Sequence, residues 1–124
     1  MPMPYVPRPP MSSAAPLPYA LPMAIVWLME WGGLTPEQYE AARQRIDWEG
    51  NAPPGLHLHV AAYDGRSMLV TEIWETPDHV QPYMDERFLP AMKDLGINSM
   101  PRVDIYEVQG VFAPPGGGFT TPAA

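Results

Sequence analysis

The sequence contains no cysteine in its 124 residues, so disulfide bonds and thiolate metal sites are excluded. Basic residues are also scarce. Seven Lys and Arg stand against fourteen Asp and Glu, which gives a net charge of −7. Proteins that bind nucleic acids neutralise phosphates with clustered Lys and Arg. We therefore do not expect nucleic acid as a partner of this chain.

Long hydrophobic runs are absent as well. The run "MAIVWLM" at residues 23–29 is far too short to span a bilayer. A secretory signal needs a basic region followed by a continuous apolar core, and prolines interrupt every apolar run near the N-terminus. We expect a cytoplasmic protein without a membrane partner.

The eighteen prolines are spread unevenly, with eight of them in the first 22 residues. All acidic residues lie between Glu30 and Glu107. A folded part this small is marginally stable alone, which favours oligomerisation. The N-terminal segment is expected to be extended. It is a free tail, an arm that docks on a partner subunit or another protein, or a stretch upstream of a domain that begins at Met23. The predicted segments are a proline-rich arm (1–22), one folded domain (23–112) and a flexible tail (113–124).

Apolar periodicity and helix-start signals predict six elements in the folded part. A period of two marks four strands, and Gly-rich or Pro-rich breaks bound them. Two segments begin with a Thr-Pro pair, which is typical of a helix N-terminus, and their apolar residues recur at helical spacing. Prolines inside the second helix predict kinks or a break. The predicted elements are strand 23–31, helix 34–48, strand 56–63, strand 67–75, helix 76–95 and strand 102–112.

This order of elements, joined by right-handed crossovers, predicts an α+β fold of the ferredoxin-like βαββαβ type. Four strands form an antiparallel sheet, and both helices lie on one of its faces. The other face has no cover, although both faces carry apolar side chains, Trp27 and Trp74 among them. An uncovered apolar face of this size marks a partner surface. We expect a homodimer in which two sheets pack face to face.

The stretch "GLHLHVAAYDG" at residues 55–65 places two histidines in one half of a predicted hairpin. A turn at Asp64-Gly65 sets His57 opposite Glu72, whereas a turn at Gly65-Arg66 sets His59 opposite Glu72 and His57 opposite Trp74. Because side chains alternate along strands, both registers place His57, His59 and Glu72 on one face. Tyr63 and Trp74 share this face. The opposite face, which includes Leu58 and Val60, is nearly all apolar and is predicted to be plain core.

A carboxylate beside an imidazole fixes the tautomer of the histidine and suits it for general-base catalysis. His59 or His57 is the candidate base, and Glu72 is the residue that orients it. Two other interpretations stay open at this point. The pairs are ordinary cross-strand contacts, in a dimer seam or in solvent, or His57, His59 and Glu72 form a two-His-one-carboxylate metal site.

The pattern resembles the dimeric α/β-barrel superfamily, which includes antibiotic-biosynthesis-type monooxygenases and stress-responsive barrel proteins. The resemblance is carried by "AIVWLMEWGGLTPEQYEAARQRI", "PPGLHLHVAAYDG", "LVTEIWETPDHVQPYMDERFLPAMKDLGI" and "VDIYEV", and it covers residues 23–112. It implies a dimer and a pocket between sheet and helices. It does not choose a reaction, because the superfamily contains heme-degrading enzymes, cofactor-free quinone-forming monooxygenases and polyketide cyclases.

Together these features predict a protein that binds a small molecule and acts as a cofactor-independent monooxygenase or cyclase on an aromatic or polyketide-like substrate. We expect no cofactor and no metal ion. The alternative is a non-catalytic homo-oligomeric assembly protein whose N-terminal arm docks on a partner. In the enzyme hypothesis, the residues predicted to line the substrate pocket are Trp27, Tyr63, Trp74, Tyr83 and Phe88.

Overall fold

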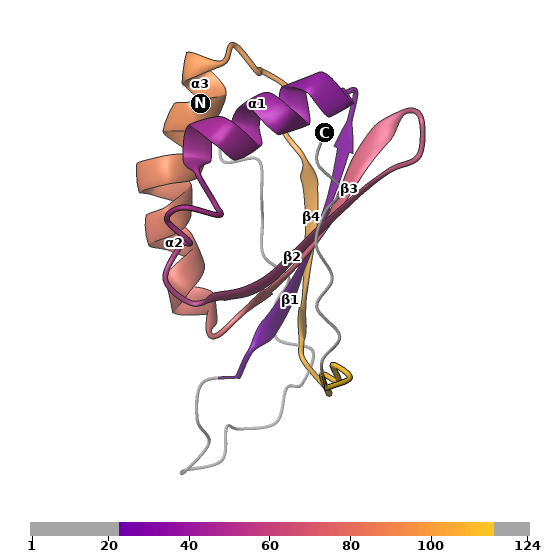
Figure 1. Cartoon of the computed structure of the whole chain (residues 1–124), viewed down its shortest axis with the longest axis vertical. Helices are drawn as coiled ribbons and strands as arrows, with labels where there is room; N and C mark the ends of the chain where they lie inside the picture. Colours follow the sequence, from indigo (N-terminus) through magenta and orange to yellow (C-terminus); the bar gives the residue numbers. More distant parts are fainter. Residues whose placement is uncertain (1–22, 116–124) are drawn as a thin grey trace.

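The computed structural model describes residues 23–115 and contains a four-stranded antiparallel sheet in the order β2-β3-β1-β4. The helices lie on one face of this sheet (Figure 1). The predicted ferredoxin-like βαββαβ arrangement is confirmed. The predicted N-terminal arm and most of the predicted tail lie outside the described residues. The strands are β1 Ile25–Gly32, β2 Leu56–Tyr63, β3 Ser67–Trp74 and β4 Arg102–Glu107, and the first helix is α1 Pro36–Ile46.

β1 lies inside the sheet, between β3 and β4. Its apolar run alternates in burial, with Trp27 buried on the helix side and Leu28 exposed on the other side. Trp27 stands opposite Glu72 of β3. β4 ends at Glu107 rather than at the predicted residue 112, because Glu107 already pairs with Ile25, the first residue of β1.

α1 begins with the capping box that its sequence predicts. The Thr35 hydroxyl accepts a hydrogen bond from the Gln38 backbone N–H at 3.1 Å, and the Gln38 side chain accepts one from the Thr35 N–H at 3.0 Å. Pro36 occupies the first turn, where a missing N–H costs nothing. The helix ends at Asp47, which has a left-handed backbone (φ 64°) and donates its N–H to the Arg43 carbonyl. This cap turns the chain toward β2.

The second helical segment is irregular, as its prolines predict. Pro90 has no N–H, and its ring crowds the carbonyl of Glu86, four residues earlier, so a regular α-helix is disfavoured there. The chain instead forms a wider π turn just before this proline. Within residues 23–115, no helix has the length and apolar character of a membrane span. The segment consists of the 3₁₀ turn η1 Pro77–His79, α2 Val80–Tyr83, the π turn η2 Met84–Phe88 and α3 Leu89–Asp94.

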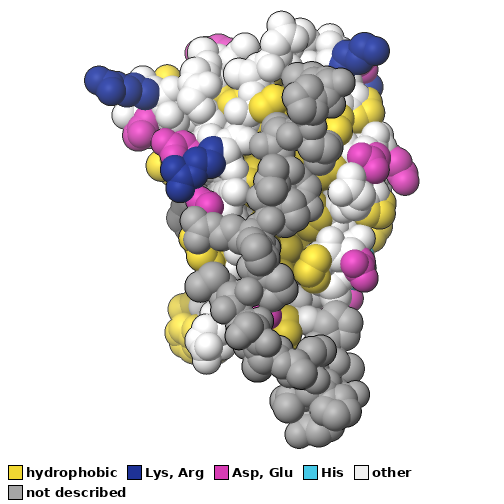
Figure 2. Space-filling model, turned by 180° about the vertical axis from the view of Figure 1, so that it is seen from behind, with side chains coloured by type: hydrophobic (Ala, Val, Ile, Leu, Met, Phe, Trp, Pro, Cys, Tyr) yellow, Lys and Arg dark blue, Asp and Glu magenta, His cyan; other side chains and the backbone are white. Residues whose placement is uncertain are grey.

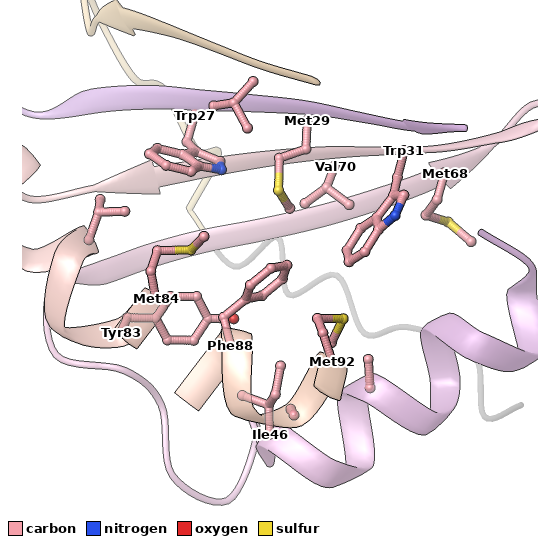
Figure 3. Close-up of a cluster of buried hydrophobic side chains, with 14 of the residues drawn as sticks. Trp27, Met29, Trp31, Ile46, Met68, Val70, Tyr83, Met84, Phe88 and Met92 are labelled. Carbon is pink, nitrogen blue, oxygen red and sulfur yellow. The ribbon is translucent and has the colours of Figure 1, made fainter. Parts of the chain in front are cut away.

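Apolar side chains from the sheet and the helices meet in one core (Figure 3). Trp31 of β1 packs against Phe88, with ring centroids 5.5 Å apart. The Trp31 indole N–H donates to the Ser99 carbonyl at 3.1 Å, so the buried ring keeps a polar partner. Methionines fill the remaining space between the rings, as their flexible side chains allow. The methionines labelled in the figure are Met29, Met68, Met84 and Met92.

The β2–β3 hairpin turns at Gly65 and Arg66, so His59 pairs with Glu72. The Asp64 carboxylate stabilises this turn by accepting the backbone N–H groups of Arg66 and Ser67 at 2.8 and 2.7 Å. Of the two predicted registers, the one with the Gly65-Arg66 turn is therefore confirmed for His59.

A β-bulge interrupts this register at His57. Leu56 pairs with Trp74 and Leu58 pairs with Ile73, so His57 is the extra residue between them. The bulge turns Leu56 toward the core and leaves the His57 side chain largely exposed. The predicted pairing of His57 with Trp74 is wrong for this reason.

The structure reverses the predicted burial of the two hairpin faces, because the face predicted to be core is the exposed one. Leu58 and Val60 are 45 % and 49 % exposed, and Leu28 and Leu69 are exposed beside them. The face that carries His59, Glu72 and Trp74 is the one covered by helices. We name the apolar set the outer face and define it by Leu28, Leu58, Val60 and Leu69. Hydrophobic side chains gather on the side of the molecule opposite to the view of Figure 1 (Figure 2).

Candidate active site

His59 and Glu72 form the centre of the site, directly opposite each other on β2 and β3. His59 Nδ1 lies 2.7 Å from Glu72 Oε2. Glu72 is only 2 % exposed, and its other oxygen accepts a hydrogen bond from Trp74 Nε1 at 3.0 Å. A buried carboxylate is costly unless it is hydrogen-bonded, and here both oxygens have a partner. The carboxylate therefore holds the imidazole in one orientation.

Tyr39 of α1 binds the other nitrogen of the same ring. Its hydroxyl oxygen lies 2.7 Å from His59 Nε2. An ionised carboxylate only accepts hydrogen bonds, so the network assigns the proton of the neutral ring to Nδ1. Nε2 then accepts the hydrogen bond that the Tyr39 hydroxyl donates. The result is a chain of hydrogen bonds from Tyr39 through His59 and Glu72 to Trp74.

Burial raises the pKa of Tyr39 to about 12. The Arg43 guanidinium lowers this pKa, and the carboxylates of Glu40, Glu49 and Glu72 raise it by smaller amounts. The phenol therefore keeps its proton at neutral pH. It acts in the network as a hydrogen-bond donor rather than as a tyrosinate.

Trp48, in the loop after α1, covers the histidine ring. The centroids of Trp48 and His59 are 4.4 Å apart, with the rings tilted by 34°. The Trp48 indole N–H donates to the Tyr83 hydroxyl at 2.9 Å, which ties the loop to α2. Tyr83 packs in turn against Trp74, and burial raises the pKa of Tyr83 above its usual value. These rings exclude water from the inner side of the imidazole.

Arg87 of η2 anchors the loop that carries Trp48. Its guanidinium donates to the carbonyls of Ile46 and Asn51, both at 2.6 Å. The Gly50 N–H donates to the Asp47 carboxylate at 3.1 Å inside the same loop. Fixed backbone at both ends places Trp48 over the site, so its position does not depend on ring packing alone.

A groove of about 620 Å³ runs along β2 beside α1 and gives the site access to solvent. His59 lies in its wall, and its side chain is 15 % exposed. Pockets of this size, with apolar walls and a few polar groups, are typical of small-molecule sites. The aromatic and ionisable lining residues are Tyr39, Glu40, Arg43, Trp48, Glu49, His57, His59 and Tyr63.

The charges at this groove do not form an anion site. Arg43 is the cation of the lining, and it is paired with Glu49 and lies 3.6 Å from Glu40. Its hydrogen bond to Glu49 lowers the pKa of that carboxyl. Two carboxylates thus compete with any anionic ligand for one guanidinium. The groove favours an uncharged molecule with flat apolar surface.

His57 is not part of the hydrogen-bond network. The bulge points its side chain outward, where Nε2 lies 3.4 Å from Glu75 Oε1 and both side chains are more than half exposed. Its prediction as a base on the face of Glu72 is therefore wrong. The proposed metal set of His57, His59 and Glu72 does not assemble either. Among residues 23–115, no cluster of three or more His, Asp or Glu has the geometry of a metal site.

The predicted pocket residues divide into two groups. Tyr63 lines the groove, whereas Trp27, Trp74 and Phe88 are buried in the core and do not reach its wall. Tyr83 is also buried but touches the site through Trp48. Apart from Tyr63, the large apolar side chains that the sequence predicted as pocket lining pack in the hydrophobic core instead.

Tyr39 and Trp48 are the site residues that the sequence analysis missed. Tyr39 belongs to the apolar stripe of α1, which indicates a core residue. Its hydroxyl partner lies twenty residues further along the chain. Trp48 lies at the end of the predicted helix, and only the left-handed turn at Asp47 directs it over β2. The available signal was that a tyrosine and a tryptophan, Tyr39 and Trp48, occur in the segment that precedes the strand of His59.

No protein-family model and no curated protein matches the sequence. Solved structures do match the fold. SnoaB, a cofactor-independent oxygenase from Streptomyces nogalater, is 15 % identical, with a TM-score of 0.57 over 74 % of this chain and 99 % of SnoaB. MupZ from Pseudomonas fluorescens is 8 % identical, with a TM-score of 0.56 over 75 % of this chain and 96 % of MupZ.

A Chloroflexus aurantiacus protein, named as a candidate antibiotic biosynthesis monooxygenase, is 17 % identical. Its TM-score is 0.50 over 76 % of this chain and 99 % of that protein. These neighbours confirm the predicted ferredoxin-like α+β fold. At such low identities the likeness establishes the fold alone, so the chemistry has to be argued from this chain's own residues.

Proposed function

We propose that the groove binds an uncharged aromatic or polyketide-like molecule and that the His59–Glu72 pair removes a proton from it. The observation that carries this proposal is the 2.7 Å contact between His59 Nδ1 and the buried Glu72 carboxylate. A carboxylate so placed stabilises the imidazolium that forms when the ring accepts a proton at Nε2. The name of SnoaB as a cofactor-independent oxygenase supports an oxygenation that follows this proton transfer.

Proton removal makes such an oxygenation possible without a metal or a flavin. A substrate such as an anthrone, whose CH₂ group lies between two aromatic rings and across the central ring from a ketone, loses one proton and becomes an electron-rich carbanion. Dioxygen accepts an electron from it, and recombination gives a hydroperoxide. Loss of water then leaves a new carbonyl. Both hydrogens of the CH₂ group leave in the water with one oxygen atom, and the other oxygen atom stays in the quinone.

The experiment uses 1,8-dihydroxyanthrone as the probe and an oxygen electrode as the readout. We expect the wild-type protein to accelerate oxygen uptake and quinone formation above the spontaneous rate. Glu72→Gln and His59→Ala should each lower this rate by about a hundredfold or more, as expected for loss of an acid–base group. Glu75→Gln, which changes an exposed carboxylate outside the groove, is the matched control. A wild-type rate equal to the spontaneous rate in buffer would refute the proposal.

We also propose that a second copy of the chain covers the outer face. The exposure of Leu28, Leu58, Val60 and Leu69 supports this pairing, because an uncovered apolar face of this kind is typical of a partner surface. The test is sedimentation velocity of the full chain. Leu58→Glu combined with Leu69→Glu should convert a dimer into a monomer, whereas Glu37→Gln on α1 should not. A wild-type monomer at high concentration would refute the pairing.

A further inference from the structure

We infer that Tyr39, rather than His59, is the residue that exchanges the proton with the bound molecule. This inference rests on the proposed function, because it assigns the atom at which the proton transfer of that function takes place. It makes Tyr39 a catalytic residue and leaves His59 and Glu72 as the groups that act through it.

Both ring nitrogens of His59 are already occupied by hydrogen-bond partners. Nδ1 is bound to Glu72 and Nε2 to Tyr39, each at 2.7 Å. Trp48 packs against the ring, and only 15 % of the side chain is exposed. A ligand in the groove therefore meets no free ring nitrogen. A direct contact with Nε2 would require Tyr39 to leave first.

Tyr39 lines the groove and is also the terminal residue of the hydrogen-bond chain on the groove side. It lines the groove from α1, whereas His59 lines it from β2. The rest of the hydrogen-bond chain runs inward from Nδ1 to Glu72 and Trp74, which are buried. Tyr39 is thus the outer end of the chain. Its oxygen retains lone pairs that can accept a proton while its own proton moves to Nε2.

The proton balance of the step is simple. The Tyr39 O–H bond breaks as its proton passes to His59 Nε2, and a new O–H bond forms with the proton taken from the ligand. The products are a ligand anion, an unchanged Tyr39 phenol and an imidazolium held beside the Glu72 carboxylate. No tyrosinate accumulates, which agrees with the burial that keeps the pKa of Tyr39 near 12. The proton returns by the same route when the product leaves.

The competing possibility is that Tyr39 is a plug that the ligand displaces to reach Nε2. The two models make opposite predictions for Tyr39→Phe, which keeps the ring and removes only the hydroxyl. In the proton-transfer model, kcat for 1,8-dihydroxyanthrone falls by about a hundredfold or more, while KM changes little, because the lost group acts in the transition state. In the plug model, Nε2 becomes free, and kcat stays the same or rises.

The control is Tyr106→Phe, which removes a hydroxyl from β4, away from the groove lining. Thermal melting of both variants checks that the fold is intact. If the wild-type protein turns over the probe, His59→Ala is inactive and Tyr39→Phe is fully active, the inference about Tyr39 is overturned. The proposed function stands in that case. A wild-type protein without turnover overturns the proposed function and this inference together.

A second measurement uses nitrogen NMR of labelled histidine with the probe bound under anaerobic conditions. If Tyr39 transfers the proton, binding leaves the Tyr39–His59 hydrogen bond in place, and the Nε2 resonance stays near its ligand-free position. If the ligand displaces Tyr39, the Nε2 resonance moves toward the position recorded for ligand-free Tyr39→Phe. That movement would contradict the inference even if the Tyr39→Phe variant proved too unstable for kinetics.

Discussion

The two faces of the β2–β3 hairpin differ in a way that reverses the ordinary rule for a sheet. The inner face buries an ionisable pair, His59 and Glu72, beneath the helices. The outer face leaves Leu58 and Val60 about half exposed. Burying the leucine and the valine and exposing the ionisable pair would stabilise an isolated chain more. The difference indicates that each face is shaped by something other than the stability of the isolated monomer.

The inner face tolerates its polar groups because all of them are paired. Among residues 23–115, every buried side-chain nitrogen and oxygen has a hydrogen-bond partner. Networks of this kind are rigid when complete and unstable when one member is lost. The outer face carries no such requirement, and its side chains can be exchanged at small cost to the folding of one chain. The following changes test this contrast, beginning with the largest expected effect.

Trp74→Ala should lower the free energy of unfolding by about 3–5 kcal/mol, because it removes a fully buried ring from the inner face. It also removes the N–H that binds Glu72. Leu69→Ala, on the outer face of the same strand, should cost less than about 1 kcal/mol. Urea unfolding followed by circular dichroism, at a concentration where the chain is monomeric, gives both values. Equal losses would abolish the contrast between the faces.

Glu72→Ala should cost about 1–3 kcal/mol, since it leaves the buried N–H groups of Trp74 and His59 without an acceptor. The matched change is Glu75→Ala, which breaks the exposed pair with His57 and should cost about 1 kcal/mol or less. Both are read from the same unfolding curves. A stable Glu72→Ala protein would mean that water or a neighbour replaces the carboxylate.

Thr35→Ala should cost about 1 kcal/mol, because it removes the hydroxyl half of the α1 capping box. Thr35→Ser keeps the hydroxyl and should retain most of the stability. The Tyr39 N–H binds the Thr35 carbonyl, so fraying of this turn also loosens Tyr39. We expect faster amide hydrogen exchange at Tyr39 in the alanine variant. Unchanged exchange would show that Tyr39 is held by its hydroxyl contact alone.

The pH dependence at the alkaline end comes last, because it is absent at neutral pH. Folding raises the pKa of Tyr39 from 10.0 to about 12, so the folded chain holds this proton more tightly than the unfolded chain. The stabilisation is fully present below pH 10 and is lost as the pH rises toward 12. Tyr39→Phe should therefore flatten the unfolding free energy across this window. An identical slope in both proteins would contradict the burial of the phenol.

Much of the fold is predictable from local signals. The bounds of β2 agree with the sequence because Gly55 and the Asp64-Gly65 pair mark its ends. The capping box of α1 and the irregular second helix follow from Thr35 and Pro90 in the same way. The contact of His59 with Glu72 follows once the turn is known. All of these depend on residues close together in sequence or joined by a short hairpin.

The remaining features depend on how the elements pack together, which local sequence patterns do not show. Leu58 and Val60 are as apolar as core residues, so alternation alone does not show which face the helices cover. The bulge at His57 leaves the alternation of "LHLH" intact in the sequence. Tyr39 reaches the site only because α1 packs beside β2, which brings its hydroxyl to a histidine twenty residues further along the chain.

The bulge at His57 also affects how related chains would be compared. A natural variant that lacked this single residue would keep the pairing of His59 with Glu72 and of Leu56 with Trp74, because the bulge only inserts His57 between these pairs. In an alignment, that deletion would remove one histidine of the "HLH" pattern without touching the other. The spacing between the two histidines is therefore a poor search pattern for relatives, and the pairing of one imidazole with a carboxylate on the next strand is the better signature.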